Sequence, residues 1–559
     1  MRTILAAICC ALLLLQPFAD GEVAGASIGR YGGSLTFGVV GTPRTFNYFM
    51  AEDHTSLLIL DFVYDGLVEY DYRTGELVPA LAASWDFNQE GTVWTFHLRQ
   101  DVLWHDGEPF TADDVLFTFG LIFDETLPFL YRESFYIDGS PFAYTKLDDY
   151  TIRLTLPRPF APLLSALTMK IMPRHKLAQP WMQGEFTRTW GIDCSLSDVV
   201  GTGPFQLVQY QRGREVVLLR NPRYWKKDAK GNLLPYLTRL VIRTKSDLAQ
   251  LYQDLGAGRL DVFEIHPGTD SALLKQIPPG YTLYDAGLGF SSNILVLNQD
   301  PNTLEEMKHR VFADQAFRQA IAHAIDQERI IQEVYGGLAV RQRAFVSPAS
   351  RFYHETAVPI YEKDLLAARE ILRLAGFSWD EADLLRSPDG WSVELSLCSN
   401  ADNPERVRMA DLIAEDLRRI GVSVEHHPVN ANVFVRKLSC GDWDCVLLGL
   451  ESTMEPHDGW DIWHSSGYFH LWQPMQLRPS TPWEGEIDRL FEVGATTMDR
   501  RKRYQAYAEA QRIAAEQLPM IFLPTASRMY LVRDKLQNVE AVGPKGVLGE
   551  ITTLWIENP

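Results

Sequence analysis

The residues best suited to chemistry gather in one stretch, 451–472, which interleaves imidazoles, carboxylates and hydroxyls with indole rings. Five of the chain's 14 Trp residues lie within 443–483. Flat aromatic faces with a few well-placed hydrogen-bonding groups are what a polar organic ligand requires. The stretch has neither helical nor strand periodicity, so we interpret it as a ligand-binding loop.

Two other interpretations of this stretch stay open. His457, Asp458, Asp461, His464 and His470 could bind a metal ion or exchange protons, which would make the protein a metal-dependent enzyme. No pair among them has the HExxH spacing that places two histidines on one face of a helix. The aromatic rings could also be packed inside a structural loop. We favour ligand contact, and we expect no catalytic residues, no metal site and no cofactor.

The elements that precede this stretch follow an alternating pattern. Apolar periodicity predicts a strand at 391–397, a helix at 409–420, and strands that begin at Val422 and Val446. Such a βαβαβ unit predicts a largely parallel sheet. Because ligands bind at the carboxyl ends of the strands in such sheets, the residues from Glu451 onward should lie at the site.

The first half of the chain contains patterns that are better explained by structure than by chemistry. Alternation at 35–39 predicts a half-buried strand, and Thr111 with Asp114 three residues later predicts a capping box at the start of a helix. The glycines at 201–203 have phosphate-loop spacing, but Pro204 and a strand follow them instead of a helix. That context excludes a nucleotide-binding loop there.

Length and charge limit the class of protein. A chain of 559 residues is too long for one core and should form two or three lobes. The apolar content of 46% and the charged content of 22% are typical of a globular protein. A net charge of −19 excludes nucleic acid as a partner, because binding phosphates requires a basic surface.

The amino-terminal residues 1–26 predict an export signal. An apolar run at 4–15 is too short to span a bilayer and is followed by small residues. Ile8, which precedes Cys9, is not the small residue that a lipoprotein signal needs. Nothing later in the chain offers 18 consecutive apolar residues. We therefore expect a free periplasmic protein.

Four cysteines remain after the signal, at Cys194, Cys398, Cys440 and Cys445. An exported chain can form disulfides, but pairing cannot be read from one sequence. Cys440 and Cys445 could form a pair, or the cysteines could simply be buried small apolar residues.

Several segments of the chain carry a family resemblance. They are 77–85 (LVPALAASW), 94–115 (WTFHLRQDVLWHDGEPFTADDV), 201–205 (GTGPF), 220–225 (RNPRYW), 317–326 (FRQAIAHAID), 442–444 (DWD) and the helix at 503–519. In order and spacing they resemble the family 5 extracellular solute-binding proteins of ABC importers, a group of oligopeptide-, dipeptide- and nickel-binding receptors.

The resemblance implies an α/β fold, namely a two-lobed periplasmic binding protein of type II in its large three-part form. The implied parts are lobe I at 27–76, 199–287 and 525–559, an inserted subdomain at 77–198, and lobe II at 288–524. A ligand would be trapped in the cleft between the lobes, and closure would shield it from water. We expect the strand at 293–298 to be one crossing between the lobes.

The function implied by this resemblance is capture of a polar solute, with a peptide favoured, for delivery to the permease subunits of an ABC importer. We expect a monomer. The ligand-binding residues that we predict come from both walls of the cleft: Thr42 and Arg44 from lobe I, and Glu451, Ser452, Trp460, Trp463, His464 and Trp472 from lobe II.

One departure from the family pattern concerns the ligand. In peptide-binding relatives, an Asp a few residues after the last strand of lobe II binds the free amino group, typically after a Gly-Trp pair. Here Leu450 follows Gly449, Ser452 or Thr453 falls near the Asp position, and Glu451 is the nearby carboxylate. An oligosaccharide or another non-peptide solute is therefore the alternative, and Trp faces suit stacking on sugars.

Overall fold

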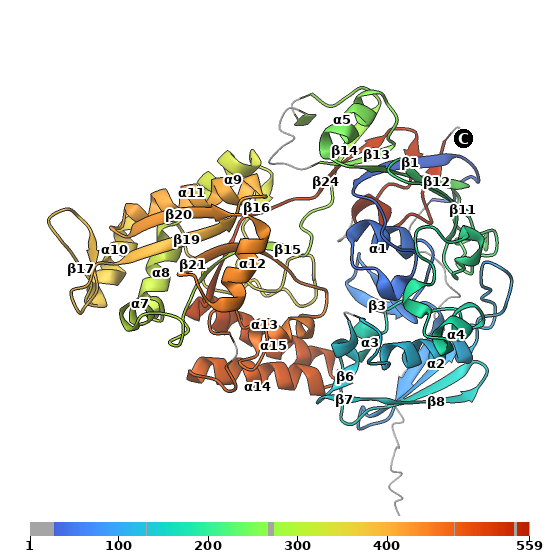
Figure 1. The fold of residues 1–559 in the computed structure, drawn as a ribbon, viewed down its shortest axis with the longest axis horizontal. Coiled ribbons are helices and arrows are strands. Elements are labelled where there is room, and N and C mark those ends of the chain that lie inside the picture. The colour runs from blue at the N-terminus through green and yellow to red at the C-terminus, as the bar shows by residue number, and fades with distance from the viewer. Residues whose placement is uncertain are drawn as a thin grey trace, which may run out of the picture.

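Two separate β-sheets organise the chain, and Figure 1 shows them in two halves joined by connecting segments. The computed structural model describes residues 27–129, 131–265, 273–274, 276–474, 476–540 and 545–557. The predicted export signal at 1–26 lies outside the described residues. Within the ranges given, no helix is both long enough and apolar enough to cross a membrane.

The first lobe, lobe I, is built on a seven-stranded sheet with the order β10-β11-β12-β1-β13-β24-β14. Its strands are β1 (Ser34–Val40), β10 (Phe205–Gln211), β11 (Glu215–Arg220), β12 (Arg239–Lys245), β13 (Val262–Ile265), β14 (Tyr281–Asp285) and β24 (Met529–Arg533). The buried Leu35 and Phe37 confirm the predicted alternation in β1. Strand β24 lies between β13 and β14 and pairs antiparallel with both, so the carboxyl-terminal segment returns to this lobe.

A second, four-stranded sheet packs beside lobe I and has the order β4-β5-β9-β8. Its strands are β4 (Ala82–Phe87), β5 (Val93–Leu98), β8 (Ala143–Asp148) and β9 (Thr151–Thr155), and helix α2 (Ala112–Ile122) contacts β8. The Asp114 carboxylate accepts the backbone N–H of Thr111 at 3.0 Å, which confirms the predicted capping box. One hydrophobic core runs through this subdomain and lobe I, from Leu35 through Trp94 to Val216.

Short elements between these two sheets face the other lobe. They are α1 (His54–Asp61), β2 (Val68–Asp71), β3 (Glu76–Pro79) and α3 (Leu163–Ala166), whereas α4 (Arg174–Met182) packs against α2. Strands β2 and β3 form an antiparallel hairpin of their own. In Figure 1, α1, β3 and α3 lie on the side of lobe I that faces the second half.

The second half, lobe II, is built on a five-stranded sheet with the order β20-β19-β21-β15-β22. Its strands are β15 (Ser291–Leu297), β19 (Glu394–Asn400), β20 (Ser423–Val429), β21 (Cys445–Glu451) and β22 (Met520–Leu523). The predicted βαβαβ unit is confirmed, because β19 runs parallel to β20 and β21 with α11 (Pro404–Arg418) and α12 (Ala431–Cys440) between them. Strand β15 runs antiparallel to β21 and β22, so the sheet is mixed.

Helices cover both faces of the lobe II sheet. One core contains residues of α8 (Gln315–Ala324), α9 (Gln327–Tyr335), α10 (Leu365–Leu374) and α11, and the other contains residues of α13 (Trp460–Trp463), α14 (Pro482–Thr496) and α15 (Arg500–Gln517). Cys398 and Cys445 are buried in these two different cores. All four described cysteines are free. The possible Cys440–Cys445 pair is therefore absent, because Cys445 points into a core while Cys440 is exposed.

The chain crosses between the lobes before β15 and again between β22 and β24, not along β15. Residues Ile294 and Leu297 of that strand are fully buried inside lobe II, which corrects the predicted crossing at 293–298. The crossing segments are bonded to each other: Ala286 N–H donates to the Arg528 carbonyl and Arg528 N–H to the Gly287 carbonyl, both at 2.8 Å. An apolar strand predicts burial but not which lobe buries it, and this is why the position was mistaken.

The lobes also touch through the subdomain and the β2–β3 hairpin. Three contacts cross here: Ala161 N–H donates to the Ala495 carbonyl at 2.7 Å, Arg158 pairs with Glu492, and Arg500 pairs with Glu76. Together with the bonded crossing segments, these contacts hold the two lobes against each other.

The close approach of Gly201 to Val63 gives the first testable prediction. A Cβ at Gly201 would lie 1.8 Å from the Val63 carbonyl oxygen, so Gly201→Ala forces the backbone apart. We expect the free energy of unfolding to fall by about 1–3 kcal/mol in urea denaturation. Gly256→Ala is the matched control: its Cβ would meet no atom within 4 Å, and it should be neutral or stabilising. Equal unfolding midpoints for the two variants would contradict the packing argument.

Candidate functional site

Two neighbouring cavities, one between the lobes and one within lobe I, share Tyr48 and Tyr131 as common lining. The outer cavity, about 390 Å³, has walls from both lobes, with Tyr70 and Ser165 from one side and residues 452–454 from the other. The inner cavity, about 400 Å³, lies deeper in lobe I. Each volume is within the range of small-ligand pockets.

Tyrosine hydroxyls line the lobe I wall of this cleft. Tyr70 and Tyr72 alternate along β2 and its end, with ring centroids 6.3 Å apart, and Tyr70 donates to the Ser165 hydroxyl at 2.8 Å. Burial raises the pKa of Tyr48 to about 12 and that of Tyr70 well above its usual value. These phenols therefore stay protonated, so Tyr48 can donate a hydrogen bond to a ligand, whereas the Tyr70 hydroxyl already donates to Ser165 and can accept one.

The lobe II wall contributes a carboxylate, Asp458, on the 3-10 helix η5 (Pro456–Gly459). Thr453 donates its hydroxyl hydrogen to Asp458 at 2.7 Å. The side chain of Asp458 is exposed to the cavity, while the protein around it, together with the negative charge of Glu455, raises the pKa of Asp458 to about 7. Thr453 falls near the position of the family's Asp, and it binds the carboxylate of Asp458, five residues later in the chain.

A buried ion pair sets the conformation of this wall. Glu455 Oε1 lies 2.7 Å from a guanidinium nitrogen of Arg503 on α15, and both side chains are almost fully buried. The same carboxylate accepts the His457 backbone N–H at 3.1 Å and so caps η5. Because η5 carries Asp458, the ion pair positions the cavity's carboxylate.

The polar residues that we predicted to bind ligand lie in different parts of the structure. Ser452 lines the outer cavity and donates its hydroxyl hydrogen to the Phe290 carbonyl at 3.0 Å. Glu451 pairs with Ser291 at the end of β21. Thr42 and Arg44 are exposed beyond the end of β1, whereas Gly38 and Val39, inside that strand, line the inner cavity.

The predicted aromatic residues lie mainly in the core of lobe II. Trp463 is 2% exposed and Trp472 is fully buried, and their ring centroids are 5.6 Å apart. Trp460 stacks on His464 with ring centroids 4.5 Å apart and packs against the same core. Of the eight predicted ligand-binding residues, Ser452 is the one found among the lining residues of the two cavities.

The five residues considered as metal ligands do not converge. His457 is packed edge-on against Phe160 of the subdomain, and burial lowers its pKa to about 3. His470 is buried and bonded to the Ile462 carbonyl at 3.0 Å. Across the described part of the chain, no group of three or more His, Cys, Asp and Glu side chains is arranged to hold a metal ion.

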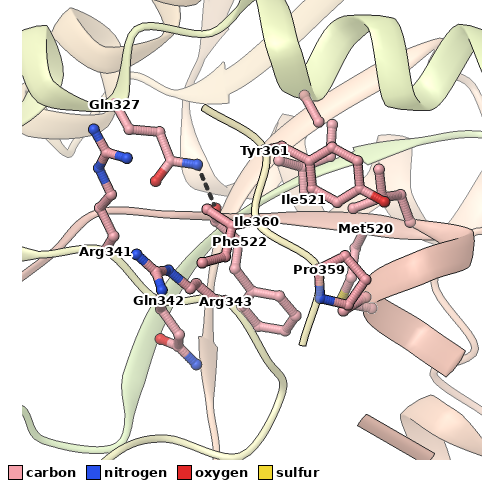
Figure 2. Close-up of a pocket in the computed structure, with 13 residues that line it drawn as sticks. Gln327, Arg341, Gln342, Arg343, Pro359, Ile360, Tyr361, Met520, Ile521 and Phe522 are labelled. Atoms are coloured by element: carbon pink, nitrogen blue, oxygen red, sulfur yellow. Dashed lines mark hydrogen bonds between the residues drawn. The ribbon is translucent and has the colours of Figure 1, made fainter. Parts of the chain in front are cut away.

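A third hollow lies within lobe II, and Figure 2 shows its lining. Gln327 donates its amide hydrogen to the Phe522 carbonyl at 3.4 Å across it, and Arg341 is paired with Glu362. Its volume of about 40 Å³ has room for little more than ordered water. The cleft between the lobes is therefore the better candidate for a ligand.

The cleft residues that sequence reasoning missed come from distant parts of the chain. The sequence gives one weak indication of Tyr70 and Tyr72: they are two positions apart, a spacing that places both rings on one face of a strand. Tyr48, the first residue of the 3-10 helix η1 (Tyr48–Met50), and Lys170 and Lys545 belong to no sequence motif that could have indicated them.

Two lobes that are joined by bonded crossing segments and that both line one cavity define a ligand-binding protein of the two-lobed class. The bacterial extracellular solute-binding proteins, family 5 Middle, match this chain over residues 76–469. The chain belongs to this family.

Individual relatives resemble the chain over almost their whole length. The dipeptide-binding protein of Escherichia coli (strain K12) is 25% identical over 538 residues, which cover 92% of this chain and 93% of that protein. The oligopeptide-binding protein AppA of Bacillus subtilis, in complex with a nonapeptide, has a TM-score of 0.70 at 24% identity, covering 95% and 100% of the two chains. MelB of Agrobacterium fabrum C58, in complex with stachyose, has a TM-score of 0.71 at 21% identity, covering 95% and 86%. The two structures support the two-lobed fold.

The buried position of Trp472 gives the second prediction. Its indole N–H donates to the buried Glu484 carboxylate at 3.0 Å. Trp472→Phe removes this hydrogen bond and leaves a void, so the free energy of unfolding should fall by at least about 2 kcal/mol. Trp391→Phe, at a residue that is 56% exposed, should change it by less than about 0.5 kcal/mol. Unchanged stability in Trp472→Phe would instead favour a ligand-stacking role.

Proposed function

We propose that this protein is the periplasmic receptor of an ABC importer, which captures a short peptide between its lobes and delivers it to membrane permease subunits. The observation that carries the proposal is the Asp458 carboxylate in a cavity with walls from both lobes. Family membership supports the receptor role, and the dipeptide-binding relative supports a peptide.

In this proposal Asp458 binds the free amino group of the peptide. An ammonium group would restore the favourable interactions that the carboxylate loses in the cavity, and charge-assisted hydrogen bonds are stronger than neutral ones. Ser452 and the protonated tyrosines would then bond the peptide amides. Since the contacts come from both lobes, a bound peptide would favour the closed arrangement.

An oligosaccharide is the second candidate, because MelB is a structural neighbour that holds stachyose. The tyrosine rings of the outer cavity could stack on sugar faces. Trp463 and Trp472, which we predicted for that role, are buried in the lobe II core. The carboxylate in the cavity favours a cationic group over a neutral sugar.

Lobe II contains a serine, a histidine and an aspartate in a hydrogen-bonded row, as in many hydrolases. The Ser399 hydroxyl lies 2.8 Å from His426 Nε2, and His426 Nδ1 lies 2.8 Å from the Asp411 carboxylate. Ser399 is fully buried and lines none of the three cavities described above. A nucleophile must reach its substrate, so we assign this chain of hydrogen bonds to holding β19, β20 and α11 together. We propose a non-catalytic protein.

The third prediction tests the ligand class. Di-, tri- and tetrapeptide mixtures should raise the melting temperature of the purified protein, whereas stachyose and related oligosaccharides should not, because ligand binding stabilises by RT ln(1 + [L]/Kd). The best peptide should then bind with a single site in calorimetry. If only oligosaccharides raise the melting temperature, the proposed ligand is a sugar and not a peptide. If neither class raises it, the proposal that this protein is a solute receptor is wrong.

The fourth prediction concerns Asp458 and pH. Asp458→Asn should weaken peptide binding by about 1.5–3 kcal/mol, roughly ten- to hundredfold, while Asp461→Asn, at a neighbouring residue that lines neither cavity, should not. Because the pKa of Asp458 is raised to about 7, the carboxyl is protonated below that pH and must lose its proton before an ammonium can bind. The wild-type Kd should therefore rise as pH falls below about 7, approaching tenfold per pH unit. A pH-independent Kd, or the same pH profile in Asp458→Asn, would exclude this residue.

A further inference from the structure

Two lysines share one aspartate on the wall of the inner cavity. Asp61, the last residue of α1, lies 2.7 Å from Lys170 Nζ and also pairs with Lys545. The three residues come from α1, from the segment after α3 and from the carboxyl-terminal segment. All three line the inner cavity, and their side chains are partly exposed there.

The charges on this wall do not cancel. The inner cavity is lined by two further ionised side chains, Arg528 and Glu264, which pair with each other at 2.9 Å. Burial alone would raise the pKa of Asp61, but Lys170 and Lys545 outweigh it and hold the pKa well below its usual value. Both lysines have raised pKa values and stay charged. Two cations and one anion leave one positive charge without a partner in the lining.

Two more carboxylates lie behind the lysines, and each is already engaged. Glu69 accepts hydrogen bonds from Lys226 at 2.6 and 2.7 Å. Asp65 is buried and accepts from the Trp225 indole at 3.0 Å and the Thr202 hydroxyl at 3.1 Å. Neither residue lines the inner cavity, so neither supplies the missing negative charge at its surface.

The rest of the inner cavity is largely apolar. Leu57, Leu58, Phe62 and Leu548 line it beside the lysines. A buried cation is costly unless a partner and hydrogen bonds compensate it, and apolar walls strengthen its attraction for an anion. The wall is therefore complementary to an anionic group attached to an apolar one.

We propose that the inner cavity is a carboxylate-binding site in which Lys170 and Lys545 bind the anion and the apolar wall takes its substituent. If the ligand is a peptide, which rests on the function proposed above, the carboxylate is its free carboxyl terminus and the last side chain is apolar. Lys545 also lies 5.9 Å from the centroid of the Tyr72 ring, which borders the outer cavity. The peptide would thus run from Asp458 in the outer cavity to the lysines in the inner one.

Matched acids and amides test this site without relying on any variant. Calorimetry would compare tripeptides of the form Ala-Ala-X, with X as Leu, Phe or Trp, in the free-acid and carboxamide forms. Ligand-observed NMR would compare 3-phenylpropionate with 3-phenylpropanamide, which need no peptide site. Wild-type protein should bind each acid at least about tenfold more tightly than its amide, the effect of one charge-assisted interaction.

Substitutions then test which residues cause the preference for acids over amides. Lys170→Met and Lys545→Met should each lose the acid preference and leave amide binding unchanged, whereas Asp61→Asn should keep or enlarge it by freeing both lysines. Lys176→Met, at a lysine that pairs with Asp106 outside the cavity, is the control and should behave as wild type. A merely structural ion cluster would lower stability in all three cavity variants without changing the acid-to-amide ratio, so melting temperatures are recorded alongside.

The outcomes separate the two proposals. If the protein prefers 3-phenylpropionate to its amide but binds no tripeptide, the proposed carboxylate site stands and the proposed peptide ligand is contradicted. Peptide binding with equal affinity for acids and amides would keep the receptor for peptides and overturn the carboxylate site. An acid preference that survives both lysine variants, or no binding of any acid, would also overturn it.

Discussion

The buried ion pair between Glu455 and Arg503 is the interaction on which the lobe II wall depends. Arg503 also donates to the Gly494 carbonyl at 2.8 Å, so one guanidinium links α15 to the end of α14 and to the loop that carries η5. Removing one partner of such a pair leaves a buried charge uncompensated and typically costs about 3–5 kcal/mol. Desolvation contributes most to the raised pKa of Asp458, the negative charge of Glu455 raises it further, and the positive charge of Arg503 opposes both, so the pair places the cavity's carboxylate and also influences its pKa.

The two walls of the cleft have opposite electrostatic character. Lobe II presents Asp458, and lobe I presents the Asp61–Lys170–Lys545 cluster with its surplus positive charge. Low-polarity walls make each charge act over a longer distance than it would in water. A ligand with both a cationic and an anionic end would therefore be able to contact both lobes.

Local patterns predicted the elements well, and the order of several sequence segments carried the family resemblance. The strand at β1, the capping box of α2 and the βαβαβ unit of lobe II were all readable, because periodicity and caps act over a few residues. The direction of β15 was not readable, since an apolar strand buried on both faces has the same pattern either way. The lobe boundaries stay a prediction.

The segment 451–472 shows which features follow from the sequence and which depend on the tertiary structure. The sequence by itself determined that this segment follows a sheet strand of a two-lobed binding protein and that it mixes aromatic and ionisable residues. Only the tertiary structure decided that Trp463 and Trp472 fill a core while Asp458 faces a cavity. Burial in a core and stacking on a ligand use the same apolar ring area, so composition cannot distinguish them. Asp458 and Lys545 stand 87 positions apart in the sequence, and they share a cleft only because the carboxyl-terminal segment returns to lobe I.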